Sequence, residues 1–302
     1  MDFLHPAGWD EALALKAERP EAVPIAGGTD LMVELNFDLH RPAALMDLNR
    51  IPELYRWDYA ADGRIRLGAN VPYTRIIAEL GDVLPGLAMA ARTVGSPQIR
   101  NRGGVGGNLG AASPAGDTHP VLVATDAVIE AASVRGVRQI AAADFYRGVK
   151  RNALERDELI SAVLLSPAAG PQQFSKIGTR NAMVIAVCSF ALAFDSAAHT
   201  VGTGIGSSAP TPRRAPEAER FLAQELPWDL TQALPRNAAP DERRRVTPLD
   251  PGLAERFGEL VSAAASPIDD VRGTAAYRRH ALKVMARRTL QWCWNDYTEV
   301  RH

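Results

Sequence analysis

Cysteine and histidine are too scarce and too scattered in this 302-residue chain to build a metal or disulfide framework. The two cysteines, Cys188 and Cys293, lie far apart in apolar or aromatic surroundings, and no CxxC pair occurs. The six histidines include no HExxH motif. These absences argue against a zinc site, an iron–sulfur cluster or a disulfide scaffold within this chain. We therefore expect no metal ligands, and two buried structural thiols in a reducing compartment.

A strong net charge and a long apolar run are also missing. The formal net charge is −1, whereas a nucleic-acid-binding domain is usually strongly basic. The longest apolar run, residues 182–194, is shorter than the roughly 20 residues that span a bilayer. The first residues have neither the basic nor the apolar part of a secretory signal. We expect a cytoplasmic protein with no nucleic-acid partner and no membrane span.

Short strands and helices alternate in the first half of the chain. The pattern predicts a helix over 10–19, a strand over 22–26, a glycine turn, a helix over 30–36 and a strand over 44–48, which together form a small βαβ unit. Further strands are expected over 65–69, 128–132 and 159–165, and further helices over 74–80 and 86–94.

The second half begins after residues 166–173, whose prolines, glycine and glutamines are typical of a linker. A hairpin is expected from 184–194 and 201–205, with helices over 217–224, 253–264 and 273–292. Residues 226–252 are rich in proline and charge, which predicts a loop. The last helix carries a basic run from Arg278 to Arg288, which is either a solvated face or a docking surface for partner subunits.

Two glycine clusters hold the most specific information. The first is Ala26-Gly-Gly-Thr-Asp-Leu31, and the second is Gly103-Gly-Val-Gly-Gly-Asn-Leu-Gly110, which continues to Asp117. Five glycines in eight residues would weaken regular structure by about 0.5–1 kcal/mol each, so the chain needs bare backbone there. Backbone N–H groups at the start of a helix bind phosphate well. Two such loops suggest a cradle for a diphosphate cofactor.

Neither cluster is a known nucleotide fingerprint. Leu109 replaces the third glycine of a Rossmann GxGxxG motif, and no Gly-Lys-Ser/Thr of a Walker A loop occurs. Thr29 can cap a helix or bind a phosphate, while the Asp30 carboxylate would repel one and more readily caps amides or faces away. Asp117 could accept a hydrogen bond from a ribose hydroxyl or a ring N–H, or it could be the N-cap of the segment 118–125. Arg100 and Arg102 could offset phosphate charge or be surface residues.

At these residues the chain resembles the FAD-binding medium subunits of the molybdenum hydroxylases, the xanthine dehydrogenase and carbon monoxide dehydrogenase family. The shared motifs are the first loop at 26–31, Ile99-Arg-Asn-Arg-Gly-Gly-Val-Gly-Gly-Asn-Leu109, Ala112-Ser-Pro-Ala-Gly-Asp117, Phe174-Ser-Lys-Ile-Gly-Thr-Arg180, Ile205-Gly-Ser-Ser-Ala-Pro-Thr-Pro212 and Asp270-Val-Arg-Gly-Thr-Ala-Ala-Tyr-Arg-Arg279. They occur in order along nearly the whole chain.

The resemblance implies an α+β fold. It consists of a two-lobed FAD-binding domain of the vanillyl-alcohol-oxidase/PCMH type, followed by a domain with a three-stranded antiparallel sheet and helices. We expect the FAD-binding domain at 1–168, with lobes of about 1–55 and 56–168, and the C-terminal flavoprotein domain at 174–302.

The resemblance also implies the site residues. The cofactor-binding set would be Ile25, Ala26, Gly27, Gly28, Thr29, Asp30, Leu31, Gly104, Val105, Gly106, Gly107, Asn108, Ser113, Asp117, Leu159 and Lys176. The two loops would bind the pyrophosphate, and Asp117 the ribityl or ribose part. Leu159 and Lys176 would lie near the flavin, where the lysine could stabilise a reduced flavin anion. The flavin carries the chemistry, so no catalytic side chain is expected.

The implied function is electron transfer within an oxidoreductase. A [2Fe-2S] small subunit would deliver electrons from a molybdopterin large subunit, and FAD would pass them to NAD or another acceptor, in a heterotrimer or a dimer of heterotrimers. A stand-alone FAD-dependent reductase on the same fold and a flavin-less scaffold are the alternatives.

Two positions depart from the family pattern. Gly104 replaces a threonine or serine, which removes a hydrogen bond worth about 0.5–1.5 kcal/mol to FAD binding. Asn36 replaces a frequent lysine and removes a nearby positive charge. The substrate stays open, because hydroxylation would take place on another chain.

Overall fold

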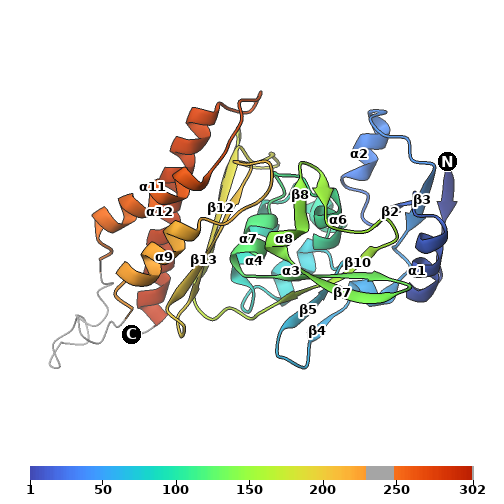
Figure 1. Ribbon diagram of the computed structural model, residues 1–302, viewed down its shortest axis with the longest axis horizontal. Coiled ribbons are helices and arrows are strands. Elements are labelled where there is room, and N and C mark those ends of the chain that lie inside the picture. Colours follow the sequence, from blue (N-terminus) through green and yellow to red (C-terminus); the bar gives the residue numbers. More distant parts are fainter. Residues whose placement is uncertain (229–247, 301–302) are drawn as a thin grey trace.

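The computed structural model describes residues 1–228 and 248–300 (Figure 1). The N-terminal part opens with a parallel sheet of order β1-β3-β2, formed by β1 (Asp2–Leu4), β2 (Val23–Ile25) and β3 (Ala44–Asp47). Helix α1 (Trp9–Glu18) joins β1 to β2, and α2 (Leu31–Asn36) joins β2 to β3. The expected βαβ unit is therefore confirmed, with β1 as an additional strand.

A five-stranded antiparallel sheet follows, in the order β4-β5-β10-β6-β7. Its strands are β4 (Trp57–Tyr59), β5 (Ile65–Gly68), β6 (Val128–Ser133), β7 (Gly136–Ala141) and β10 (Leu159–Leu165). Strand β10 is buried along its whole length, in accordance with its uninterrupted apolar sequence. The short elements between these strands are the 3-10 helix η1 (Pro52–Tyr55), α3 (Tyr73–Glu79), α4 (Pro85–Thr93), α5 (Pro97–Arg100), α6 (Val105–Ala111), α7 (His119–Ala124), α8 (Ala142–Phe145), and the hairpin strands β8 (Tyr146–Gly148) and β9 (Arg151–Asn152).

The C-terminal part contains an antiparallel sheet of order β11-β12-β13. Its strands are β11 (Gln172–Ile177), β12 (Cys188–Asp195) and β13 (Thr200–Gly206), and its helices are α9 (Pro216–Glu225), α11 (Pro251–Ala264) and α12 (Ala275–Val300). The antiparallel three-stranded sheet expected from the family is thus present. Strand β11 begins inside the expected linker, and most of the loop expected at 226–252 lies outside the described residues.

Strand β12 is buried on both faces, which explains the long apolar run around it. Phe190, Leu192 and Phe194 belong to a core shared with the C-terminal helices, while Ala191 belongs to the core of the N-terminal part. Helices α9, α11 and α12 cover one side of the sheet, and α4 and α7 lie on the other side (Figure 1). Both cysteines are buried free thiols, and burial raises the pKa of Cys188 to about 12. No helix among the described residues is both long and apolar enough to cross a bilayer.

Glycines on β13 let helix α7 pack directly against the strand backbone. A Cβ at Gly202 would lie 1.9 Å from the Ala124 carbonyl oxygen, and one at Gly204 would lie 1.8 Å from the Pro120 carbonyl oxygen. Neither oxygen can move without displacing α7. The contact between the N-terminal part and the C-terminal sheet therefore requires glycine at these two positions.

Gly204→Ala is expected to lower the free energy of unfolding by about 2–3 kcal/mol, because the added methyl group must displace α7. Urea unfolding of the variant measures the effect. Gly8→Ala is the matched control, since a Cβ at Gly8 would meet nothing within 4 Å. Equal urea midpoints for Gly204→Ala and the wild type would show that the contact between α7 and β13 is loose enough to accept a methyl group.

Candidate functional site

The two glycine loops touch each other at the starts of helices α2 and α6. A Cβ on Gly27 would lie 2.1 Å from the Arg102 carbonyl oxygen, so only glycine permits this approach. On the other side of the contact, a Cβ on Gly103 would lie 3.3 Å from the Thr29 hydroxyl. Segments that are 75 residues apart in the sequence (27 and 102) thus form one surface.

The first loop follows β2 and turns sharply into α2. Gly28 has φ +71°, a left-handed conformation that favours glycine. The Ala26 carbonyl is fixed by the side-chain amide of Asn49, at 3.0 Å. Asp30 is exposed at the N-cap of α2, and its side chain makes no capping hydrogen bond. The structure therefore favours a carboxylate that faces away from the loop over one that caps the helix amides.

The glycines of the second loop divide into two kinds. Gly106 is required for packing, because a Cβ there would lie 2.6 Å from the Ala69 Cβ, and its N–H donates to the Ala69 carbonyl at 2.9 Å. Gly107 and Gly110 are exposed, and a Cβ on either would meet nothing within 4 Å. These two glycines lie three residues apart, on one face of α6. Packing within the described protein does not require glycine at either position. The missing side chains instead leave this part of the backbone open to a ligand.

Gly104, the departure from the family pattern, is held close to a neighbouring segment. It forms an isolated antiparallel bridge with Pro72, and a Cβ there would lie 2.9 Å from the Val71 carbonyl oxygen and 3.0 Å from that of Ala69. A threonine at this position would need the chain around Val71 to shift. The absence of a side chain at Gly104 thus lets residues 69–72 lie close to the start of α6.

Buried polar side chains fix the underside of α6. The Thr118 hydroxyl donates to the Asn108 side-chain oxygen at 2.7 Å. His119 is fully buried, and its two ring nitrogens lie 3.0 Å from the Ser113 carbonyl and 3.2 Å from the Asn108 carbonyl. A Cβ at Gly116 would lie 2.4 Å from this ring. His119 therefore connects the two halves of the second loop.

Folding is expected to become less favourable in acid because of His119. Burial lowers the pKa of His119 to about 4, below its value in an unfolded chain, so protons bind preferentially to the unfolded state between about pH 6.5 and 4. The free energy of unfolding should fall by about 1.4 kcal/mol per pH unit in this window from this group. In urea titrations at several pH values, His119→Gln should show a shallower slope of unfolding free energy against pH than the wild type. Identical slopes in the wild type and His119→Gln would contradict this account.

Asp117 and Lys176 form a buried ion pair between the N-terminal part and strand β11. The Lys176 ammonium lies 2.6 Å from Asp117 Oδ2 and donates to the Thr93 carbonyl at 3.2 Å. Both side chains are less than 10% exposed, and burial raises the pKa of Asp117 while Lys176 opposes the rise. Asp117 does not cap α7, whose N-cap is Thr118. Its Oδ1 atom is buried and has no hydrogen-bond donor among the described residues.

The remaining predicted residues lie around this framework. Ile25 ends β2, Leu31 begins α2 and Val105 begins α6. Ser113 accepts a local hydrogen bond from the Ala115 N–H at 3.3 Å. Leu159 is 1% exposed in the core of the N-terminal part, so it supports the site from behind rather than facing open space.

The flanking arginines and the basic run of α12 are engaged with the protein. Arg100 donates to the carbonyls of Val94 and Gly95, and Arg102 reaches Asn49. On α12, Arg278 is buried and joins the carbonyls of Val187 and Ser207 to Asp270. Within the same run, Lys283 and Arg287 pair with glutamates of α11, namely Glu255 for both and Glu259 for Lys283. Much of this run thus holds the C-terminal helices together.

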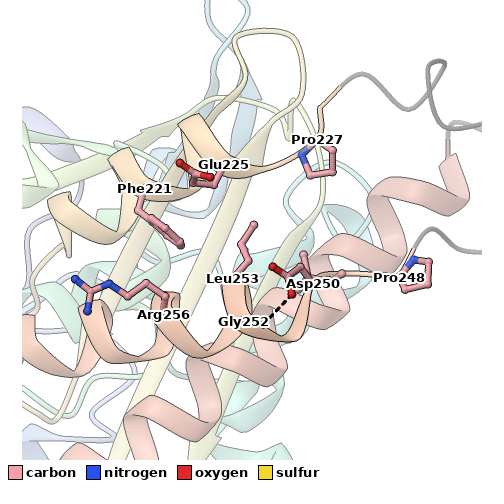
Figure 2. A pocket seen from close by; sticks show the side chains of 9 residues that line it. Phe221, Glu225, Pro227, Pro248, Asp250, Gly252, Leu253 and Arg256 are labelled. Atoms are coloured by element: carbon pink, nitrogen blue, oxygen red, sulfur yellow. Dashed lines mark hydrogen bonds between the residues drawn. The ribbon is translucent and has the colours of Figure 1, made fainter.

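The cleft drawn in Figure 2 lies elsewhere, between α9 and α11 of the C-terminal part. It has a volume of about 460 Å³ and is lined by Phe221, Leu253, Arg256 and their neighbours. Asp250 lies in its wall and accepts from the Gly252 N–H at 2.9 Å. It contains no residue of the glycine loops.

Comparison with known proteins identifies the family. A model described as the FAD binding domain in molybdopterin dehydrogenase matches residues 1–167, and one described as the CO dehydrogenase flavoprotein C-terminal domain matches residues 246–293. The chain is a member of the FAD-binding medium subunits of the molybdenum hydroxylases. This medium subunit is 30% identical over 300 residues to 6-hydroxypseudooxynicotine dehydrogenase complex subunit alpha of Paenarthrobacter nicotinovorans, covering 96% of this chain and 93% of the relative.

Other relatives match over similar lengths. The nicotine 6-hydroxylase medium subunit of the same organism is 29% identical over 295 residues, with 95% of each chain covered. A chain of reconstituted CO dehydrogenase from Oligotropha carboxidovorans superposes with a TM-score of 0.86 at 25% identity, with 98% of each chain covered. The resemblance seen in the motifs is thus confirmed, as are the mixed α/β architecture and the oxidoreductase class.

The residues present fit FAD. The exposed Gly107 and Gly110 leave the backbone of α6 open, and the touching loops at Gly27 and Gly103 place two glycine-rich turns at one place. The unpartnered Asp117 Oδ1 is an acceptor-only atom, which suits a cofactor hydroxyl or ring N–H. The individual FAD contacts of the predicted residues remain predictions.

Proposed function

We propose that this medium subunit holds FAD along the two touching glycine loops and transfers electrons through it from a [2Fe-2S] partner to NAD or another acceptor. The observation that supports the proposal best is the face of α6 at Gly107 and Gly110, which are both exposed and where an added Cβ would meet nothing within 4 Å. Bare helix backbone of this kind allows a bulky anion to approach closely. NAD as the acceptor is proposed from the family resemblance, and a cytoplasmic location from the two free, buried thiols, which suit a reducing compartment.

The protein would supply binding, orientation and electrostatics. Loop 26–31 and the start of α6 would bind the pyrophosphate through backbone N–H groups, while Asn108 and Ser113 offer neutral side chains nearby. Bound FAD can accept electrons singly or in pairs, which suits a carrier between a one-electron cluster and a hydride acceptor. Lys176 and Asp117 would lie next to the flavin, and their mutual pairing means that Lys176 adds little net positive charge there.

Partner chains would carry the rest of the reaction. We propose a molybdopterin-binding large subunit and a [2Fe-2S] small subunit, in a heterotrimer or a dimer of heterotrimers. Names such as "medium subunit" and "complex subunit alpha" among the relatives support a multi-chain assembly. The surface next to the first loop also suits a protein partner, because Met32, Val33, Phe37 and Leu39 are exposed large apolar residues within eight positions.

Purification of the affinity-tagged chain from its native host tests the proposal. The expected product is a complex of three different chains that contains FAD, iron and molybdenum, with FAD assigned to this chain after separation. A flavin-containing chain that copurifies with no iron or molybdenum protein would favour a stand-alone FAD-dependent reductase. A colourless chain with no FAD affinity would contradict the proposal and favour a flavin-less scaffold.

A further inference from the structure

An ion pair connects two segments at the far end of the cofactor-binding region. The Lys150 ammonium, in the turn between β8 and β9, lies 2.5 Å from Glu34 Oε1 on α2. The two residues are 116 positions apart in the sequence. The Lys150 side chain is 57% exposed and that of Glu34 is 26% exposed, so solvent and salt reach the pair.

The hairpin that carries Lys150 is anchored to the end of α6. The Lys150 N–H donates to the Ala112 carbonyl at 3.2 Å, and the Asn152 side-chain amide donates to the Gly110 carbonyl at 3.0 Å. Lys150 has φ +53° and Ala112 has φ +44°, both in the left-handed region that non-glycine residues rarely adopt. Such conformations persist where the surrounding structure enforces them, often at ligand clamps.

These contacts join α2 to the end of α6 through the β8–β9 hairpin. Helices α2 and α6 start at the contact between Gly27 and Arg102. Near their other ends they are joined by Glu34, Lys150 and the hairpin. In Figure 1, α2 stands apart from α6, and β8 lies beside α6. Apart from the loop contact at the start of the helices, the Glu34–Lys150 pair is a direct polar link between α2 and the β8–β9 hairpin.

We propose that the Glu34–Lys150 pair is a strap that holds α2 to the β8–β9 hairpin and slows the release of FAD. The strap rests on the proposed function, because it needs FAD between the helices that it joins. Opening the pair would let α2 move away from the hairpin while the loop contact at Gly27 stays intact. Glu34 and Lys150 are therefore positioning residues: they retain the cofactor without taking part in its chemistry.

The rate of FAD release tests the strap. The loaded chain is mixed with an excess of an apo-flavoenzyme that traps free FAD, and the enzymatic activity that the trap gains is followed over time. Exposed ion pairs are worth up to about 1 kcal/mol, so Glu34→Gln and Lys150→Met should each speed release by about two- to five-fold. The charge swap Glu34→Lys/Lys150→Glu should restore a rate within about two-fold of the wild type. High salt should bring the rates of wild type and single variants together.

Lys283→Met is the matched control, because Lys283 is a partly exposed lysine paired with glutamates in the C-terminal part. Its release rate should equal that of the wild type. Unchanged release in both single variants would overturn the strap. Slower release in Glu34→Gln with faster release in Lys150→Met would also overturn it, because Lys150 would then bind the cofactor anion directly. Failure of the wild type to bind FAD would overturn the proposed function as well, and equilibrium titration distinguishes that result.

Discussion

Replacing Gly107 with valine is expected to give a folded chain that has lost its FAD. A Cβ at Gly107 would meet nothing within 4 Å and the residue is exposed, so the substitution should leave the core undisturbed. Valine also has a better helix propensity than glycine, by about 0.4 kcal/mol, which should leave stability equal or slightly higher. The isopropyl group would occupy the space that the cofactor must approach, and FAD affinity should fall at least about 100-fold, or about 2.7 kcal/mol.

Fluorescence titration with FAD and urea unfolding of the same samples measure the two effects. Gly8→Val is the matched control, because Gly8 also has open space around it but precedes α1, outside both loops. It should bind FAD like the wild type. Normal FAD affinity in Gly107→Val would place the cofactor away from this face of α6.

The second large effect is expected from Lys176→Met. The substitution leaves the Asp117 carboxylate buried and without its counter-ion, which should lower the free energy of unfolding by about 3–5 kcal/mol. Adding Asp117→Asn should recover part of this loss, because the double variant buries no charge. Urea unfolding of the two single variants and the double variant gives the coupling energy. Additive losses would show that the pair does not act as a unit.

The pH dependence separates this pair from His119. Burial raises the pKa of Asp117, so the folded state binds the proton more tightly than the unfolded state. From this group alone, stability is lost as the pH rises from the unfolded pKa through the folded pKa. This is opposite in sign to His119, whose lowered pKa makes acid destabilising. In acid, the free energy of unfolding should therefore fall more steeply with decreasing pH in Asp117→Asn than in the wild type.

The sequence predicted the elements whose pattern is local. The turn at Gly27 and Gly28 between a strand and a helix, and the apolar run of β12, each have a short-range signal. The turn was found at the expected place, whereas β12 begins at Cys188, four residues later than expected. The motifs also indicated the family, because their order and spacing extend along nearly the whole chain. Domain boundaries and individual FAD contacts are not tested by the fold alone and stay predictions.

The roles of single glycines and charges depend on long-range contacts that no local pattern reveals. The sequence could not show that Gly27 and Gly106 serve packing while Gly107 is open, because the deciding atoms belong to Arg102 and Ala69. Lys176 was predicted near the flavin, but its pairing with Asp117 depends on how strand β11 meets the N-terminal part. Lys150 had no motif at all, and only its contact with Glu34 makes it noticeable.

The amount of FAD bound by the purified chain tests the central claim most directly. The chain is saturated with FAD, freed of excess cofactor by gel filtration, and denatured so that the released flavin can be measured against protein concentration. The account predicts one FAD per chain and a visible flavin spectrum before denaturation. A folded chain that retains no flavin, and shows no binding in equilibrium titration, would contradict it.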